Sequence, residues 1–203
     1  MNTVIHSIFP TPIYVSNLNR KFSKEEISFF NKTKKNCIKN IGNITSKDNY
    51  ILNNVVLKKL KNEIDLRIKD YFDKIISSNY NIKPYITQSW LNYTEVNQYH
   101  HKHDHPNSVV SGVLYINSNK DFDKIKFFKK EYKQIRFNVK EWNSFNSESW
   151  FFNVESGQII LFPSSLTHMV ETKEGDNTRI SLAFNIFFKG KIGSDIELTE
   201  LSI

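Results

Sequence analysis

The hydrophobic periodicity of the sequence changes at Pro84, and this change limits the fold more than any other feature. Before Pro84, apolar residues recur every three or four positions, which is typical of amphipathic helices. After Pro84, short segments rich in β-branched and aromatic residues follow one another, which is typical of strands. Helices followed by strands favour an α+β, mainly β protein, with the helices packed on one face of a sandwich or barrel.

Two helices are expected in the first part of the chain. The first begins at Ser23, which forms a capping-box pattern with Glu26, and it continues to about Lys39. Residues 41–53 are polar and rich in turn formers. The second helix is expected at about residues 55–76, with one apolar face formed by Leu57, Leu60, Ile64, Ile68, Phe72 and Ile75.

The second part of the chain carries seven expected strands. They are residues 85–96, 109–116, 124–129, 150–154, 158–162, 167–172 and 179–188. Residues 5–15 are expected to be extended, and residues 129–148 form the longest irregular stretch, which we interpret as a loop over one mouth of the sheet. Because no repeat or linker divides the chain, we expect one domain over residues 1–203. Residues 1–83 would be its mainly helical support and residues 84–190 its β core.

Composition excludes several classes of protein. A hydrophobic content of 39% with 14% aromatic residues predicts a packed core and not a disordered chain. The single cysteine, Cys37, excludes an intrachain disulfide, and its helical spacing indicates a buried structural thiol. There is no pattern of a signal peptide and no apolar run that could span a bilayer. We therefore expect no membrane partner and a cytoplasmic location, in a microbe or in a phage-infected host cell.

The charge pattern gives little support to a nucleic-acid partner. The formal net charge is +7, but the charges are scattered along the chain. The nearest approach to a basic cluster, residues 124–133, also contains acidic and aromatic residues. A solvated surface is the expectation for this segment, and nucleic-acid binding is the minority alternative.

The histidines are the residues that point to chemistry. Four of the six lie in the segment Tyr99-His-His-Lys-His-Asp-His105. Because residues i and i+2 of a strand share a face, His103 and His105 can offer two imidazoles to one metal ion, and His101 with His103 is a rival pair. A third ligand from a distant strand would complete a facial triad with open positions, and His168 is the one histidine downstream of the cluster.

Three further segments give these histidines a context. They are His103-Asp-His-Pro-Asn-Ser-Val-Val-Ser-Gly-Val-Leu-Tyr115, Gly157-Gln-Ile-Ile-Leu-Phe-Pro-Ser-Ser-Leu-Thr-His168 and Arg179-Ile-Ser-Leu-Ala-Phe-Asn185. In this order the chain resembles the 2-oxoglutarate/Fe(II) oxygenases of microbial and phage genomes, which are relatives of the prolyl hydroxylases. The opening Ile8-Phe-Pro-Thr-Pro-Ile-Tyr14 is also similar to that family. The resemblance is strong from Trp90 to Phe188 and weak in the helices. It implies a double-stranded β-helix, also called a jelly roll or cupin-like fold.

The resemblance also implies a set of site residues. Fe(II) would be bound by His103, His105 and His168, and O2 would react there with the co-substrate 2-oxoglutarate. Arg179 would bind the distal carboxylate of 2-oxoglutarate, because a guanidinium can donate two parallel hydrogen bonds to it. Ser181, Tyr93 and Tyr115 are further candidates for that carboxylate. The activity implied is a hydroxylation that releases succinate and CO2.

One feature departs from the commoner pattern of the superfamily. That pattern is His-x-Asp, whereas this chain has His105 in the place of the carboxylate, and Asp104 would point to the opposite face. A three-histidine site leaves the +2 charge of the metal to be neutralised by a bound 2-oxo dianion. The metal preference and the choice between His105 and His101 therefore stay open at this stage.

Two other classes of function remain as alternatives. One is a cupin-like three-histidine metal protein with a different activity, which would have no need of Arg179. The other is a non-catalytic binding module with a degenerate site. The prime substrate is open: a small molecule or a protein side chain is expected first and a nucleic acid second, with selectivity assigned to residues 41–53 and 129–148. The oligomeric state, including a homodimer, is open as well.

Overall fold

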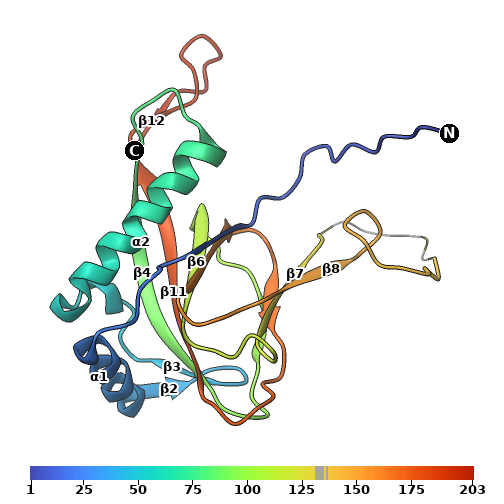
Figure 1. Cartoon of the computed structure of the whole chain (residues 1–203). Helices are drawn as coiled ribbons and strands as arrows, with labels where there is room; N and C mark the ends of the chain where they lie inside the picture. Colours follow the sequence, from blue (N-terminus) through green and yellow to red (C-terminus); the bar gives the residue numbers. More distant parts are fainter. Residues whose placement is uncertain (131–134, 136) are drawn as a thin grey trace.

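The computed structural model describes residues 1–130, 135 and 137–203 (Figure 1). The first helix, α1 (Lys24–Thr33), begins as expected: the Ser23 hydroxyl accepts a hydrogen bond from the Glu26 amide at 3.2 Å. In return, the Glu26 carboxylate accepts one from the Ser23 amide at 2.8 Å. Both atoms would otherwise be unpaired at the helix start, so this pair fixes where the helix begins.

The first helix ends six residues earlier than expected. After Thr33 come a 3-10 turn, η1 (Lys34–Asn36), and a strand, β2 (Cys37–Lys39), which pairs with β3 (Ile44–Ser46). Cys37 therefore lies on a strand and not on a helix. The reversal between the two strands contains Gly42, whose φ of 88° is a conformation that suits glycine. Pairing with a neighbouring strand overrides the local helical spacing here.

The second helical segment has the expected bounds. A 3-10 turn, η3 (Val55–Leu57), leads into α2 (Lys58–Tyr71), and a π-helical segment, η4 (Phe72–Ile76), ends it. Leu60, Ile64 and Ile68 are buried as expected, but Ile75 is exposed. A π-turn holds more residues per turn than an α-helix, so it shifts the phase of the side chains and turns Ile75 out of the apolar face. Elsewhere, residues 51–53 form a short 3-10 helix, η2 (Ile51–Asn53).

All seven expected strands are present. They are β4 (Lys83–Thr94), β6 (Val110–Asn117), β7 (Lys124–Phe128), β8 (Ser149–Asn153), β9 (Gln158–Pro163), β10 (His168–Val170) and β11 (Arg179–Lys189). Beyond β2 and β3, the sequence patterns missed the short strands β1 (Tyr14–Asn17), β5 (His100–His103), β12 (Lys191–Ile192) and β13 (Leu201–Ser202). These have two to four residues, too few for an alternating pattern to be recognised.

All described strands except β12 and β13 form two facing antiparallel sheets, and β12 and β13 pair with each other. The larger sheet has the order β1-β9-β6-β11-β4-β3-β2, and the smaller has β5-β10-β7-β8. Helix α2 lies across the outer face of the large sheet, over β4 and β11, while the β7–β8 hairpin extends away from the body (Figure 1). The fold is thus α+β and mainly β, a jelly roll with helices on one face, as the sequence predicts.

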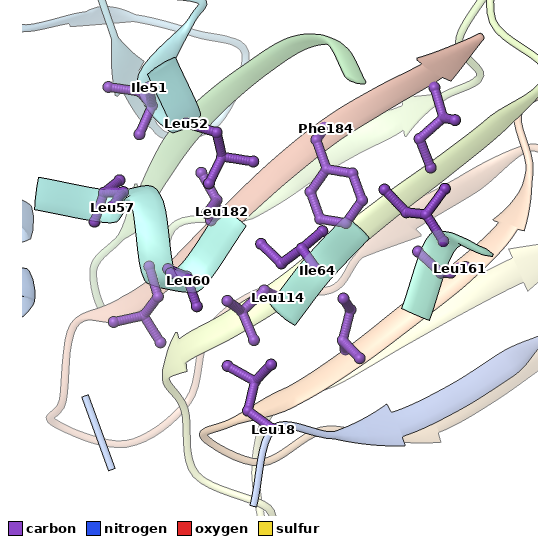
Figure 2. Close-up of a cluster of buried hydrophobic side chains, with 14 of the residues drawn as sticks. Leu18, Ile51, Leu52, Leu57, Leu60, Ile64, Leu114, Leu161, Leu182 and Phe184 are labelled. Atoms are coloured by element: carbon purple, nitrogen blue, oxygen red, sulfur yellow. The ribbon is translucent and has the colours of Figure 1, made fainter. Parts of the chain in front are cut away.

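The alternation of side chains along the strands of the large sheet separates two apolar clusters. On the outer face, Leu182 and Phe184 of β11 pack with Leu60 and Ile64 of α2 (Figure 2). On the inner face, a smaller cluster lies between the two sheets and contains Val113, Tyr115, Ile125, Phe127, Val154, Ile160 and Phe162. The outer cluster joins helices to sheet, and the inner one borders the candidate site.

The described parts of residues 129–148 contain no helix, and a strand begins only at Ser149. Residues 131–134 and 136 of the expected loop and basic cluster lie outside the described residues. Among the helices of the described residues, none is both long enough and apolar enough to cross a membrane.

Candidate metal centre and co-substrate pocket

The structure brings together the three histidines of the expected triad. His103 ends β5, His105 follows two residues later, and His168 begins β10 opposite His103 in the antiparallel pairing. The ring centroids are 4.4 Å apart for His103 and His168, 4.9 Å for His103 and His105, and 5.1 Å for His105 and His168. One ring nitrogen from each lies within 4.8 Å of the other two, so a single metal ion can be reached by all three.

Hydrogen bonds to the backbone orient two of these rings. Nδ1 of His103 is 2.7 Å from the carbonyl oxygen of His101, and Nδ1 of His168 is 3.0 Å from that of Leu166. A carbonyl oxygen only accepts, so each Nδ1 must be the protonated nitrogen, and Nε2 keeps its lone pair. His105 is held differently: its backbone amide donates to the Ser164 carbonyl oxygen at 3.0 Å. Each imidazole is therefore placed by local backbone geometry.

The surroundings keep the three imidazoles neutral. Burial lowers the pKa of His168 to about 3 and that of His105 to about 4, and in both cases the neighbouring His103 adds to the effect. Burial also lowers the pKa of His103. Since only a neutral imidazole offers a lone pair, these groups are ready to bind a metal ion at neutral pH.

A second group of histidines shares one member with the triad. Among the described residues, His100, His101 and His103 also offer nitrogens within 4.8 Å of one another. All three of these come from β5, whereas the triad adds the buried His168 from a neighbouring strand. His103 cannot give the same lone pair to two ions, so the two groups are alternatives for one ion. The rival pair of His101 with His103 that the sequence raises stays open, although this group takes His100 and not His168 as its third member.

The expected carboxylate-binding arginine is buried and only partly paired. Arg179, the first residue of β11, is 3% exposed. Its Nη1 donates to Asp123 Oδ1 at 3.1 Å, while its buried Nη2 has no hydrogen-bond partner in the described residues. A buried donor left unpaired costs about 1–3 kcal/mol, so this nitrogen indicates a place for a ligand acceptor.

Two further unpaired polar atoms lie on the same face of the sheet. Ser181 shares the inner face of β11 with Arg179 and lies between Tyr115 on β6 and Asn92 on β4 in the strand pairing. The Tyr115 hydroxyl and Asn92 Oδ1 are buried, and neither has a hydrogen-bond partner among the described residues. The donors of Arg179 and Tyr115 fit a carboxylate. Asn92 belongs to no sequence motif, and the available signal was its position in the alternating strand expected at residues 85–96.

Tyr93 corrects one expectation. Its hydroxyl donates to the carbonyl oxygen of Phe30 at 2.6 Å, and its ring belongs to the outer apolar cluster beside the helices. Adjacent residues of a strand point to opposite faces, so Tyr93 points away from the inner face that Asn92 occupies. It helps to fasten α1 to the sheet and takes no part in the candidate pocket.

Aromatic side chains surround the histidines. The rings of Phe162 and Phe127 lie 4.7 Å and 6.1 Å from that of His168, and Trp90 lies 5.7 Å from His105. These apolar walls exclude water from part of the metal centre. They also account for the desolvation that lowers the histidine pKa values.

Comparison with known proteins relates part of this chain to one family. Residues 88–185 match the model of the family described as "Putative 2OG-Fe(II) oxygenase". This part of the chain is therefore similar to a 2OG-Fe(II) oxygenase domain. The matched residues contain all three histidines of the triad together with Arg179, and the match confirms the resemblance seen in the sequence. Enzymes of this class use Fe(II), 2-oxoglutarate and O2.

Solved structures give the same fold at low sequence identity. A prolyl hydroxylase from Trichoplax adhaerens, in complex with a peptide fragment of hypoxia inducible factor, is 15% identical with a TM-score of 0.60; the match covers 86% of this chain and 83% of that one. HygX from Streptomyces hygroscopicus, with nickel, 2-oxoglutarate and hygromycin B bound, is 13% identical with a TM-score of 0.56 over 87% and 82%. A prolyl-4-hydroxylase from Pseudomonas putida is 11% identical with a TM-score of 0.52 over 86% and 92%. No curated protein sequence matches the chain.

Proposed function

We propose that this protein is a 2-oxoglutarate- and Fe(II)-dependent dioxygenase that hydroxylates a C–H bond of its substrate. One oxygen atom of O2 would enter the substrate and the other would enter succinate, with release of CO2. The observation that carries this proposal is the pairing of three neutral imidazoles with a buried, half-paired arginine in one domain. A metal site of another function would have no need of the arginine.

His103, His105 and His168 are the proposed iron ligands. The fit rests on the donor set, since three imidazoles within 4.8 Å of one another suit a divalent transition metal and leave positions open on it. When bound, the iron would supply a site at which O2 and the keto acid react. The carbonyl oxygens of His101 and Leu166 hold two of the rings in the tautomer that binding requires.

Arg179 and Tyr115 are the proposed donors to the distal carboxylate of 2-oxoglutarate. Both have a buried polar atom without a partner in the described residues, and both are on the inner face of the large sheet. Ser181 lies opposite Tyr115 in the pairing and is the proposed third donor. A charge-assisted pair in a dry site is stronger than a neutral hydrogen bond, so Arg179 would supply most of the binding free energy.

The prime substrate is left open by this arrangement. Among proteins of the same fold, one structure contains hygromycin B and another contains a peptide fragment. Both a small molecule and a protein segment can therefore reach sites built on this fold, and fold alone does not select between them. The two classes are the substrates we would screen first, with nucleic acid second.

The test uses 2-oxoglutarate turnover by the intact chain. Protein purified without oxygen and loaded with Fe(II) should convert 2-oxoglutarate to succinate when O2 is admitted, even slowly and without prime substrate. With ¹⁸O-labelled O2, one labelled atom should appear in the succinate. Succinate formed without label, or formed equally after iron is removed by a chelator, would contradict the proposal.

A further inference from the structure

A buried group of three charged side chains lies behind the proposed carboxylate site. Asp123 and Lys173 have fully buried side chains, and Arg179 is 4% exposed at its side chain. Both cations converge on one oxygen: Asp123 Oδ1 is 3.1 Å from Arg179 Nη1 and 3.5 Å from Lys173 Nζ. Charged groups are rarely buried unless they are paired, so a cluster of three calls for a specific reason.

The cluster is held rigidly by neighbouring segments. Asp123 Oδ2 accepts a hydrogen bond from the Asn119 amide at 2.8 Å. Lys173 Nζ donates to the carbonyl oxygen of Glu174 and, at 3.0 Å, to Asn177 Oδ1. The backbone amide of Lys173 in turn donates to the Gln98 carbonyl oxygen at 2.7 Å. Asp123 and Lys173 are therefore fixed before any ligand arrives.

The charges of the cluster do not cancel. Two cations and one carboxylate leave one net positive charge in a place that water does not reach. A pair of Arg179 with Asp123 alone would be neutral and would attract a carboxylate weakly. With Lys173 sharing the same aspartate oxygen, one positive charge is left over, next to the unpaired Arg179 Nη2.

We propose that Lys173 is a positioning residue for co-substrate binding: it neutralises Asp123, so that the charge of Arg179 is available to one carboxylate. Asp123 in this scheme is the anchor that fixes the guanidinium through Nη1. Lys173 itself touches no ligand. The inference rests on the proposed function, because the carboxylate in question is the distal one of 2-oxoglutarate.

The test measures binding and not turnover. The Fe(II)-loaded chain is titrated calorimetrically, without oxygen, with 2-oxoglutarate and with 2-oxopentanoate, which has a methyl group in place of the distal carboxylate. Lys173→Met should weaken 2-oxoglutarate binding by roughly ten- to a hundredfold, as expected for one buried charge at short range. Binding of 2-oxopentanoate should not change. Lys173→Arg should keep most of the affinity.

A charge-restoring double variant separates this role from a packing role. In Asp123→Asn combined with Lys173→Met, Arg179 again carries the only net charge, so 2-oxoglutarate affinity should recover toward the wild-type value. A lysine that only supports packing predicts a double variant no better than Lys173→Met, and that outcome overturns the inference. The matched control is Lys120→Met, since Lys120 forms an exposed ion pair with Glu155 at 3.8 Å. Its 2-oxoglutarate affinity should stay near that of the wild type.

The outcomes also distinguish the two proposals. If the wild-type chain binds iron but no 2-oxoglutarate, the proposed function fails. If the wild type binds 2-oxoglutarate and Lys173→Met binds it equally well, the function stands and only the role of Lys173 is refuted.

Discussion

At the scale of single residues, the three metal-site imidazoles differ in how they are held. His103 and His168 each have one ring nitrogen bound to a carbonyl oxygen two residues earlier in the chain. His105 is positioned through its backbone amide and by Trp90, whose ring lies 5.7 Å away. It is also the candidate ligand that the sequence leaves open against His101. His105 is therefore the ligand whose replacement is most informative.

Substitutions at His105 and His101 test which of them completes the site. With His105 as the ligand, His105→Asp should retain iron better than His105→Ala, because a carboxylate can still reach a divalent ion and a methyl group cannot. His101→Ala should leave iron binding intact. Anaerobic Fe(II) titration of the three variants provides the measurement. Loss of iron in His101→Ala with retention in His105→Ala would support the rival group of His100, His101 and His103.

Arg179 should matter for the co-substrate and not for the metal. Arg179→Ala removes the guanidinium that β11 brings to the pocket, and truncating one partner of a buried charged pair costs about 2–5 kcal/mol. The variant should need far more 2-oxoglutarate for turnover while it binds Fe(II) as the wild type does. Succinate formation at an unchanged 2-oxoglutarate requirement would show that the carboxylate is bound elsewhere.

The sequence predicts those residues whose role follows from a local motif. The histidines and Arg179 are of this kind, because their spacing along two or three strands carries the information. Asp123 could not be assigned, since its partner Arg179 is 56 residues away and nothing local marks the pair. The two tyrosines show the same limit: Tyr115 has its hydroxyl in the pocket and Tyr93 does not, and only the strand pairing decides which face each occupies.

At the scale of elements, the start of α1 depends on a short polar network. Glu26 accepts hydrogen bonds from the Ser23 amide and from both Nη atoms of Arg20, at 2.7 Å and 2.8 Å for the latter. Arg20 also donates to Glu63 of α2 at 2.8 Å, so the network ties the two helices together. The capping box was visible in the sequence, but the link to α2 was not, because it spans 43 positions.

This network predicts a loss of stability in acid. Burial alone would raise the pKa of Glu26, but hydrogen bonds from Arg20 and the Ser23 amide outweigh it and lower the pKa below its usual 4.5. A carboxyl with a lowered folded-state pKa stabilises the fold above its unfolded-state pKa, and this contribution disappears as the pH falls through the folded value. Glu26→Gln should therefore reduce the free energy of unfolding at pH 7 and make less difference at about pH 3.

Urea unfolding at both pH values gives the comparison. Glu197→Gln is the control, because Glu197 is exposed and lies far from the start of α1 in the chain. Ser23→Ala should cost about 0.5–2 kcal/mol at either pH, as expected for the loss of a helix cap. An equal effect of Glu26→Gln at both pH values would show that its charge plays no part.

Gly112 lies at a tightly packed position of the large sheet. It lies on β6 opposite Phe184 and Leu161, and a Cβ added there would be 2.3 Å from a Phe184 ring carbon and 2.6 Å from Leu161 Cδ2. Both neighbours are fully buried beneath α2, so they have little room to move. Gly112→Ala should cost about 1–3 kcal/mol by overpacking. Ala183→Gly changes a residue on the inner face of the same sheet and serves as the comparison. Thermal unfolding of both variants would show whether the loss of stability in Gly112→Ala comes from the outer cluster.

At the scale of the whole molecule, the two faces of the large sheet have different tasks. Along β11, Ile180, Leu182 and Phe184 point to the helices and form the stable core, while Arg179 and Ser181 point between the sheets. The site can therefore contain unpaired polar atoms while the outer cluster supplies the stability. The sequence predicts this division through its alternation, but it does not show how the small sheet closes over the inner face. The strand β5 is too short to be read from a pattern, and its pairing with β10 joins residues that are far apart in the chain.

The same division predicts how metal should affect the stability of the molecule. The strands β5 and β10 have four and three residues, and their pairing is irregular between His168 and Val170. Because few backbone hydrogen bonds join these two strands, their pairing is weak. A metal ion bound to His103 and His168 would join them. An ion that binds only the folded state at a hundred times its Kd adds about 2.7 kcal/mol, which should raise the melting temperature by several degrees.

His168→Ala provides the decisive comparison. Without metal, the variant should melt within a few degrees of the wild type, because the small sheet adds little to the outer core. With a stoichiometric excess of Fe(II) or Ni(II), only the wild type should gain stability, since two remaining imidazoles rarely hold a labile divalent ion. Anaerobic thermal melts of both proteins, with and without metal, give the four values needed. A metal-dependent gain in His168→Ala as large as that of the wild type would mean that the ion is bound by the histidines of β5, and that the two strands are not joined by it.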